Sequence, residues 1–425
     1  MPASFQVASS GKVTVSGKMT INTTTPVVVI RCARHGGLGI TRTLGRLGVP
    51  MYNIDESRNA PTFYSRYSKG SFVWDAERAP AEETIQFLKQ VAEKIGRRPI
   101  LIPTSDGTAM LVADHADELS QWYDFPRMDP ALVRAFCSKE EMYHLAKRYN
   151  VPTPETLFPH SREELVQFLS DPAAVKFPVM AKGNYGIALE RKSGKRMFIA
   201  NTREEVLDIY DKYEDWNAPN IMLQEYIPGG PESIWMLDGY FDGDSNCLLQ
   251  YTGRKIRQYP AYTGLTSLGE LVRNDAVSKI TTDFMKACGY RGILDLGYRY
   301  DERDGQYKLL DVNPRVGATF RLFTGANDMD VVRALYLDMT GQPVEFVPAK
   351  EGRKWLVEDC DIVSCLKYYR DGKLNFNQWL QSHKGVDEKA VFAMDDPLPA
   401  FWMGLRDLGM LWKQKTGKKA GSGLL

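Results

Sequence analysis

The sequence predicts an α/β and α+β protein with a small parallel α/β domain followed by a larger mixed domain. Two observations predict this architecture. A β-branched run at 26–30 leads through a glycine-rich turn into a helical pattern and a second strand pattern at 49–54, which indicates a βαβ unit. Beyond residue 130, short helices alternate with strands. The expected divisions are a leader (1–25), the α/β domain (26–130), the mixed domain (131–345) and a C-terminal extension (346–425).

The α/β domain is expected to contain two further elements after the βαβ unit. Residues 81–96 are amphipathic, with apolar side chains at the spacing of one helical face. Residues 99–103 read PILIP, which is typical of a buried strand, and they run into Ser105 and Asp106. Ligands of open α/β sheets bind beyond the carboxyl ends of the strands. We therefore treat both residues as candidates for substrate binding, with a helix cap as the alternative for Asp106.

Three helices of the mixed domain are predicted by capping boxes, in which a Ser or Thr is followed three residues later by Glu. Strands are expected at 177–183 and at 221–226, and a helix is expected at 275–288, where Gly289 supplies the stop. The C-terminal extension contains an aromatic helical stretch and a basic tail at 413–425. The three boxes are Ser138 with Glu141, Ser161 with Glu164, and Thr202 with Glu205.

Composition excludes several classes of protein. The 425 residues carry 54 Lys and Arg against 53 Asp and Glu, a net charge of +1, and 43% of them are apolar. These values are ordinary for a globular protein and argue against a disordered chain or a coiled coil. Nucleic-acid binding normally requires a basic excess, so no nucleic-acid partner is expected. No apolar run is close to the length of about 20 residues that a membrane span needs, so no membrane partner is expected either.

The six cysteines and five histidines narrow the chemistry. No two cysteines form a Cys-x-x-Cys pair, a pattern that suits free thiols in a reducing cytoplasm better than disulfides or a structural zinc site. The histidines are scattered, so any metal is expected to be a hard cation held by oxygen ligands. Because the first 25 residues also show no apolar signal-peptide core, we expect a cytoplasmic protein.

The most informative stretch, residues 292–315, has the composition of two strands joined by a turn. With the loop taken as 301–305, Asp295 falls directly opposite Asp311, and their Cβ atoms would lie about 4.5–5.5 Å apart. Side chains alternate between the two faces along a strand. One face of the second strand is therefore expected to carry Asp311, Asn313 and Arg315.

Two carboxylates this close repel each other unless a positive charge lies between them. A divalent cation would supply that charge and Asn313 an uncharged oxygen ligand, a donor set that suits Mg²⁺. Arg315 could then hold a transferring phosphoryl group. The alternative is a strand edge and a plain turn, because a one-residue slip in register would put the carboxylates on opposite faces. This stretch alone supports both interpretations equally.

Several landmarks, in order along residues 26–345, resemble the ATP-grasp superfamily of carboxylate–amine or carboxylate–thiol ligases, most closely the D-aspartate ligase type. The resemblance implies an ATP-grasp fold preceded by a pre-ATP-grasp α/β domain. It implies that Lys139, after its helix cap, and Lys182, at the end of the strand FPVMAK, bind the phosphates of ATP. In the segment LQEYIPG and just beyond it, the resemblance implies adenine contacts from the backbone at Gln224, Glu225 and Ile227 and a ribose contact from the Glu232 carboxylate.

The same resemblance makes Asp295, Asp311 and Asn313 the ligands of Mg²⁺, with Mn²⁺ as an alternative, and Arg315 the arginine of an Asn-x-Arg motif. Many family members have Glu at the two Asp positions, and residues 183–194 match the family's glycine-rich phosphate loop only in part. The implied reaction activates a small carboxylate as an acyl phosphate and joins it to an amine, with release of ADP and phosphate. Both substrates, and the choice of amine or thiol, stay open.

Weaker signals add further candidates. In strand conformation Lys255 and Arg257 would point the same way and could contact phosphate or carboxylate, with a solvated face as the alternative. His35 precedes the glycines at 36–39, which lack the third glycine of a dinucleotide-binding motif, and by resemblance this loop contacts substrate. Thr319 and Arg321 follow the strand that carries Asp311 and Asn313. They are expected to line the pocket for the carboxylate substrate.

Two other functions are kept as alternatives. One is a nucleotide-binding regulatory protein that retains the fold without turnover, and the other is an NAD-dependent oxidoreductase that uses the loop at 36–39. The complete set of metal and phosphate candidates favours an enzyme. Its expected partners are small-molecule carboxylate and amine substrates, and a homodimer is the default assembly.

Overall fold

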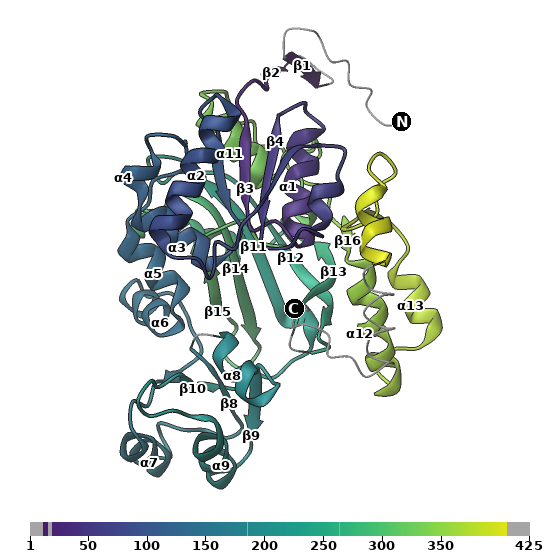
Figure 1. Ribbon diagram of the computed structural model, residues 1–425. Coiled ribbons are helices and arrows are strands. Elements are labelled where there is room, and N and C mark those ends of the chain that lie inside the picture. The colour runs from purple at the N-terminus through teal and green to yellow at the C-terminus, as the bar shows by residue number, and fades with distance from the viewer. Residues whose placement is uncertain (1–11, 16–18, 185, 263, 406–425) are drawn as a thin grey trace.

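A computed structural model describes residues 12–15, 19–184, 186–262 and 264–405 of the chain. Its N-terminal domain is built on a parallel four-stranded sheet in the order β5-β4-β3-β6 (Figure 1). A hairpin of β1 (Lys12–Val15) and β2 (Met19–Asn22), within the predicted leader, precedes this sheet. The sheet strands are β3 (Val27–Ile30), β4 (Met51–Asp55), β5 (Ser68–Val73) and β6 (Ile100–Pro103).

Strand β3 is buried on both faces because helices cover each side of the sheet. Val27 and Val29 pack in one core with α1 (His35–Gly45), whereas Val28 and Ile30 pack in another with α2 (Ala81–Ile95). A continuous apolar run is typical of such a central parallel strand. The predicted βαβ unit and helix are thus confirmed. The domain is completed by η1 (Pro61–Tyr64), α3 (Asp106–Asp114), α4 (Ala116–Leu119) and α5 (Pro130–Cys137).

A seven-stranded sheet in the order β15-β14-β11-β12-β13-β16-β17 forms the centre of the molecule. Its strand pairs are antiparallel except for β16 with β17. One face packs against α1 and α11 (Val331–Met339), and the other against α6 (Lys139–Arg148) and α10 (Asp275–Cys288). The strands are β11 (Ile234–Phe241), β12 (Cys247–Tyr259), β13 (Leu265–Leu271), β14 (Gly292–Asp301), β15 (Gln306–Asn313), β16 (Lys354–Leu356) and β17 (Val386–Lys389).

A third unit has its own sheet, in the order β7-β10-β8-β9, and its own apolar core. It lies beyond one end of the central sheet, at the bottom of Figure 1. The strands are β7 (Thr156–Leu157), β8 (Val179–Gly183), β9 (Met197–Ala200) and β10 (Ile221–Glu225). The helices are α7 (Arg162–Ser170), α8 (Gly186–Ser193) and α9 (Arg203–Tyr213).

The predicted helix ends are confirmed. The side chains of Ser138, Ser161 and Thr202 each accept a hydrogen bond from the backbone amide three residues later, at the starts of α6, α7 and α9. Gly289 ends α10 with φ of 70°, a conformation that favours glycine. The remaining elements are η2 (Pro231–Ser233), η3 (Phe320–Leu322), α12 (Glu358–Arg370) and α13 (Phe376–Ser382). The predicted basic tail at 413–425 lies outside the described residues.

Buried ion pairs connect the C-terminal extension to the rest of the molecule. The Arg42 guanidinium on α1 lies 2.9 Å from the Asp396 carboxylate, and both side chains are almost fully buried. Arg321 contacts Asp330 at 2.5 Å and Glu388, on β17, at 2.7 Å. The extension is therefore part of the folded body, because removing it would leave the Arg42 guanidinium buried without a counter-charge and Arg321 without one of its two carboxylate partners.

Arg257 forms a third buried ion pair, between β12 and α12. Its Nε and Nη2 donate to the two oxygens of Asp361 at 2.8 and 2.9 Å, and its Nη1 donates to Ser382 at 2.7 Å. The Asp361 side chain is 1% exposed. This bidentate contact fixes α12 against the central sheet.

All six cysteines carry free thiols. In the described part of the chain no helix is both long enough and apolar enough to cross a membrane.

We expect Arg257→Met to lower the free energy of unfolding by about 3–5 kcal/mol, because it leaves the Asp361 carboxylate buried without its partner. Urea denaturation followed by circular dichroism measures this change. Arg273→Met is the matched control, since Arg273 pairs with Asp275 at 2.7 Å on the surface. The control should unfold close to wild type, and equal losses in the two variants would contradict the assignment.

Candidate functional site

Strands β14 and β15 form the predicted hairpin, but in a different register. Asp295 lies opposite Asn313, and Asp311 lies opposite Gly297. The loop is one residue shorter than expected, and Leu310 is an extra, bulged residue. The predicted direct opposition of Asp295 and Asp311 is therefore wrong. The shorter loop and the bulge each shift the register by one residue. Because the total shift is two residues, both carboxylates and Asn313 still lie on one face of the sheet.

Lysine side chains from two other elements approach this face. Lys139, at the first position of α6, places Nζ 3.0 Å from Asp311 Oδ1. Burial acts to raise the pKa of Asp311, but the charge and hydrogen bond of Lys139, together with the charges of Lys182 and Arg315, hold that pKa below its usual value. Lys255 on β12 interacts electrostatically with both Asp295 and Asp311, while its own burial lowers its pKa to about 8. The carboxylates thus lie among cations.

Arg315 connects the sheet face to the N-terminal domain. Its Nε donates to Asp106 Oδ1 at 2.7 Å, at the start of α3, and its Nη2 donates to Asn313 Oδ1 at 3.0 Å. Asp106 is held in place because Ser105 caps α3 by accepting a hydrogen bond from Thr108. Arg315 and Asp106 are 209 residues apart in the sequence, so the sequence alone could not show that they are in contact.

Asp238 is a site residue that the sequence reasoning missed. It lies on β11 directly opposite Asp295, is fully buried, and neither carboxylate oxygen has a hydrogen-bond partner among the described residues. Burial and the neighbouring Asp295 raise the pKa of Asp238 well above its usual value, and burial raises the pKa of Asp295 to about 6. A lone carboxylate in the apolar strand IWMLDGYF was the available signal.

The donor set fits Mg²⁺ that is shared with a nucleotide better than a metal cage made by protein alone. In the described residues no group of three or more His, Cys, Asp and Glu side chains is placed to hold a metal. Two carboxylates with an amide oxygen match the few protein ligands that Mg²⁺ takes when phosphate oxygens complete its shell. Backbone also approaches closely here, since a Cβ at Gly317 would lie 2.6 Å from Asp295 Cγ.

Lys182, the second predicted phosphate-binding lysine, lies on β8 of the third unit. Its side chain makes no hydrogen bond or ion pair with any residue that the structure describes. Burial and the nearby Lys139 charge together lower its pKa to about 7, against the opposing effect of Asp311. A buried lysine that lacks a counter-charge and lies near a second lysine is arranged to receive an anion.

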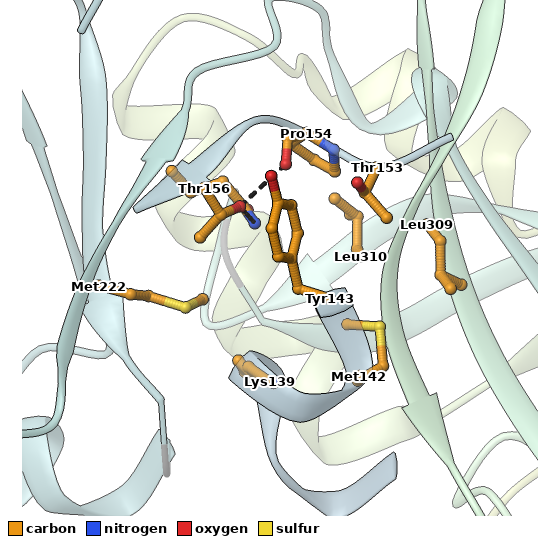
Figure 2. Close-up of a pocket in the computed structure, with 10 residues that line it drawn as sticks. Lys139, Met142, Tyr143, Thr153, Pro154, Thr156, Met222, Leu309 and Leu310 are labelled. Atoms are coloured by element: carbon orange, nitrogen blue, oxygen red, sulfur yellow. Dashed lines mark hydrogen bonds between the residues drawn. The ribbon is translucent and has the colours of Figure 1, made fainter. Parts of the chain in front are cut away.

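A small pocket opens beside Lys139 between α6, β10 and β15 (Figure 2). One wall is apolar and includes Met222, Leu309 and Leu310. Gln224 supplies a polar group: its Nε2 donates to Thr156 at 3.1 Å, and its buried Oε1 has no partner among the described residues. An apolar slot with an unsatisfied amide oxygen matches the needs of a flat heteroaromatic base with an amino group.

The other predicted nucleotide-binding residues lie at the end of β10 and just beyond it. Glu225 forms ion pairs with Arg303 and Lys308, at 2.5 and 3.3 Å. Ile227 is buried, whereas Glu232 is exposed in η2 and accepts a hydrogen bond from the Gly230 amide at 3.0 Å. The structure therefore groups Gln224 with the pocket, while salt bridges already occupy the Glu225 carboxylate.

Arg257 and Arg321 lie in structural contacts that sequence alone did not indicate. A bulge in β12 pairs Lys255 with Gly269 and Arg257 with the next residue, Leu268, so Lys255 and Arg257 point to opposite faces. The prediction that they point the same way is wrong for this reason. Thr319 is buried at the start of η3, and Arg321 in the same element forms ion pairs with Asp330 and Glu388.

His35 begins α1, and its ring lies 5.5 Å from that of Trp355. Burial lowers its pKa to about 4, and its buried Nε2 has no partner among the described residues. The preceding Arg34 was missed by sequence reasoning. Burial lowers the pKa of Arg34, and the charges of Arg31, Arg196 and Arg315 lower it further. Arg34 itself is exposed, and the charges that act on it come from three parts of the fold.

Comparison with known proteins supports the fold. No known protein-family profile matches the sequence. Over 284 residues, the chain is 26% identical to the D-aspartate ligase of Enterococcus faecium (strain Aus0004), an alignment that covers 64% of this chain and 67% of that enzyme. Among solved structures, N5-carboxyaminoimidazole synthetase from Staphylococcus aureus, complexed with ADP, superposes with a TM-score of 0.60 at 11% identity, over 80% of this chain and 83% of that one.

The biotin carboxylase domain of Hydrogenobacter thermophilus 2-oxoglutarate carboxylase, solved as a dimer with MgADP and bicarbonate, superposes with a TM-score of 0.57 at 14% identity, over 77% of this chain and 73% of that one. This chain has the ATP-grasp fold. The fold class predicted from the sequence is confirmed, and D-aspartate ligase is its homologue.

We expect MgADP affinity to fall as the pH rises from 7 to 9, because Lys182 is largely neutral above pH 7 in the free protein and must take up a proton to face phosphate. The slope should approach about tenfold in affinity per pH unit, measured by titration calorimetry. Lys182→Arg should remove most of this slope, since arginine stays charged throughout the range. Identical slopes in both proteins would contradict the role of Lys182.

We expect Leu310→Trp to weaken MgADP binding at least about tenfold, because an indole would fill the pocket without space for a second ring system. Loss of the nucleotide-induced rise in melting temperature measures the effect. Leu265→Trp is the matched control, since Leu265 is 44% exposed and does not line the pocket. Normal nucleotide binding by Leu310→Trp would place the base elsewhere.

Proposed function

We propose that the protein is an ATP-dependent ligase that activates a small carboxylate as an acyl phosphate and joins it to an amine. The observation that carries this proposal is the face of the central sheet on which Asp295, Asp311 and Asn313 lie together, with Lys139 and Arg315 bound to them. Similarity to D-aspartate ligase supports a carbon–nitrogen ligase.

The proposed reaction has two steps. A carboxylate oxygen of the first substrate attacks the γ-phosphorus of ATP, and the bond from that phosphorus to the bridging oxygen breaks, so ADP leaves. The amine then attacks the acyl carbon, phosphate leaves with the electron pair of its bond to that carbon, and the nitrogen loses a proton. Water must be excluded between the steps, because hydrolysis would destroy the acyl phosphate.

The proposed roles follow from charge. Lys139 and Lys182 hold the phosphates of ATP, and the pocket beside Lys139 holds its base. Asp295, Asp311 and Asn313 would hold Mg²⁺, which offsets the charge that develops on phosphoryl transfer. Arg315 orients the transferring group, because Asp106 and Asn313 fix its guanidinium plane from two sides.

The arginines near the start of α1 offer a position for the carboxylate substrate. Arg31 is matched by Glu77 at 3.1 Å and Arg196 by Glu190 at 3.1 Å, whereas Arg34 has no carboxylate partner among the described residues. The charge of Arg34 interacts electrostatically with that of Arg315. We assign this region to the substrate carboxylate that awaits phosphorylation.

The glycine loop that suggested NAD binding is used for packing. A Cβ at Gly36 would lie 3.1 Å from Ala318 Cα, and a Cβ at Gly37 would lie 2.5 Å from the Cys32 carbonyl oxygen. The chain itself therefore occupies the space next to this turn. This observation favours the ligase over an NAD-dependent oxidoreductase.

We expect Asp311→Asn to lower ADP formation at least about 100-fold, because it removes one of the two proposed metal carboxylates and keeps the side-chain shape. A coupled assay of ADP release over pairs of amino acids and other small carboxylates measures it, with the melting temperature as a check on folding. Asp283→Asn, on the exposed face of α10, is the matched control.

Full turnover by Asp311→Asn would refute the metal assignment. If the wild-type protein bound MgATP but released no ADP with any substrate pair, it would be a nucleotide-binding regulatory protein instead.

A further inference from the structure

On helix α12 polar side chains face the protein and apolar side chains face solvent, the reverse of an ordinary surface helix. Its buried stripe consists of Asp361, Ser364 and Tyr368, which face the central sheet. Its outer stripe is apolar, with Ile362, Val363, Leu366 and Tyr369 each 52–64% exposed. A surface helix of a monomer normally shows the opposite distribution.

The apolar exposure extends over neighbouring elements. On α13, Phe376 is 65% and Leu380 is 50% exposed. Helices α12 and α13 lie side by side at the right-hand margin of the molecule in Figure 1, beyond β13. Contiguous apolar surface of this kind marks an interaction site in a soluble protein.

Charged residues continue the outer stripe at both ends of α12. Asp359 lies one turn before Val363, and Arg370 lies one turn after Leu366. Neither Asp359 nor Arg370 forms an ion pair within the described part of the chain. The stripe therefore carries a free negative charge at its start and a free positive charge at its end.

We propose that the outer face of α12 is the interface of a twofold dimer, in which α12 packs antiparallel against α12 of a second copy of this chain. In one antiparallel register, Asp359 of each copy meets Arg370 of the other, and the same register places Val363 against Leu366. A single alignment thus matches both the charges and the apolar residues. Antiparallel packing also sets the two helix dipoles favourably.

The occupant is a second copy because the stripe is complementary to itself. In a twofold interface every contact between two different residues occurs twice, so a helix with opposite charges at its two ends pairs with its own reverse. A different protein would need its own acidic and basic ends in this spacing. The proposal stands apart from the ligase chemistry, since it requires neither nucleotide nor metal.

Sedimentation velocity of the full chain at micromolar concentration tests the proposal. Wild type should sediment as a dimer, and Leu366→Glu should raise the dissociation constant at least about 100-fold, because each interface would then bury two carboxylates. Val73→Glu, on an exposed position of β5, is the matched control and should remain dimeric. Circular dichroism and the melting temperature confirm that each variant is folded.

Charge exchange tests the register. Arg370→Glu should weaken the dimer about tenfold by setting like charges opposite each other, and Asp359→Lys combined with it should restore wild-type affinity. A monomeric wild type would overturn the proposal, because the face would then be covered within one chain or by another protein. A dimer that Leu366→Glu leaves intact would place the interface elsewhere, and failure of the double exchange would overturn the antiparallel register.

Discussion

The contact between the Lys139 ammonium and the Asp311 carboxylate is the interaction on which the site depends. Two carboxylates on one face of a sheet repel each other, and here a cation from the start of a helix offsets that repulsion. The same logic continues through Asn313 and Arg315 to Asp106. These contacts join side chains from different elements, so the site exists only when the N-terminal domain, α6 and the central sheet are assembled together.

This arrangement explains why the polar face can lie between two apolar cores. The opposite face of β14 and β15 is packed with Leu294, Leu296 and Val312 against α6 and α10. That packing fixes the strands, and the strands fix the carboxylates. Because α6 contributes both to the core and, through Lys139, to the site, burial of its apolar face positions the charge at its start.

Local rules predicted much of the fold. The β-branched run of β3, the caps at Ser138, Ser161 and Thr202, and the stop at Gly289 act within a few residues of chain, so the sequence shows them directly. The side of the hairpin on which Asp295 and Asp311 lie was also predictable, because side chains alternate along a strand. Several sequence landmarks, which occur in the order typical of the ATP-grasp superfamily, then identified the fold.

Long-range pairing was not predictable in the same way. The bulge at Leu310 changes the partner of Asp295, and the bulge in β12 turns Arg257 away from Lys255 towards a carboxylate 104 residues later in the chain. A bulge depends on how both strands pack, and it leaves no mark in a single strand. Asp238 and Arg34 become informative only once tertiary structure surrounds them.

The pairing of Arg42 with Asp396 has a consequence for how the protein is made. The ribosome releases α1 early, but the carboxylate that neutralises Arg42 is synthesised 354 residues later. Domains generally fold in order from the N-terminus during synthesis. Here the N-terminal domain must keep a guanidinium group hydrated until Asp396 has emerged from the ribosome, so helix α1 reaches its final packing only after that point.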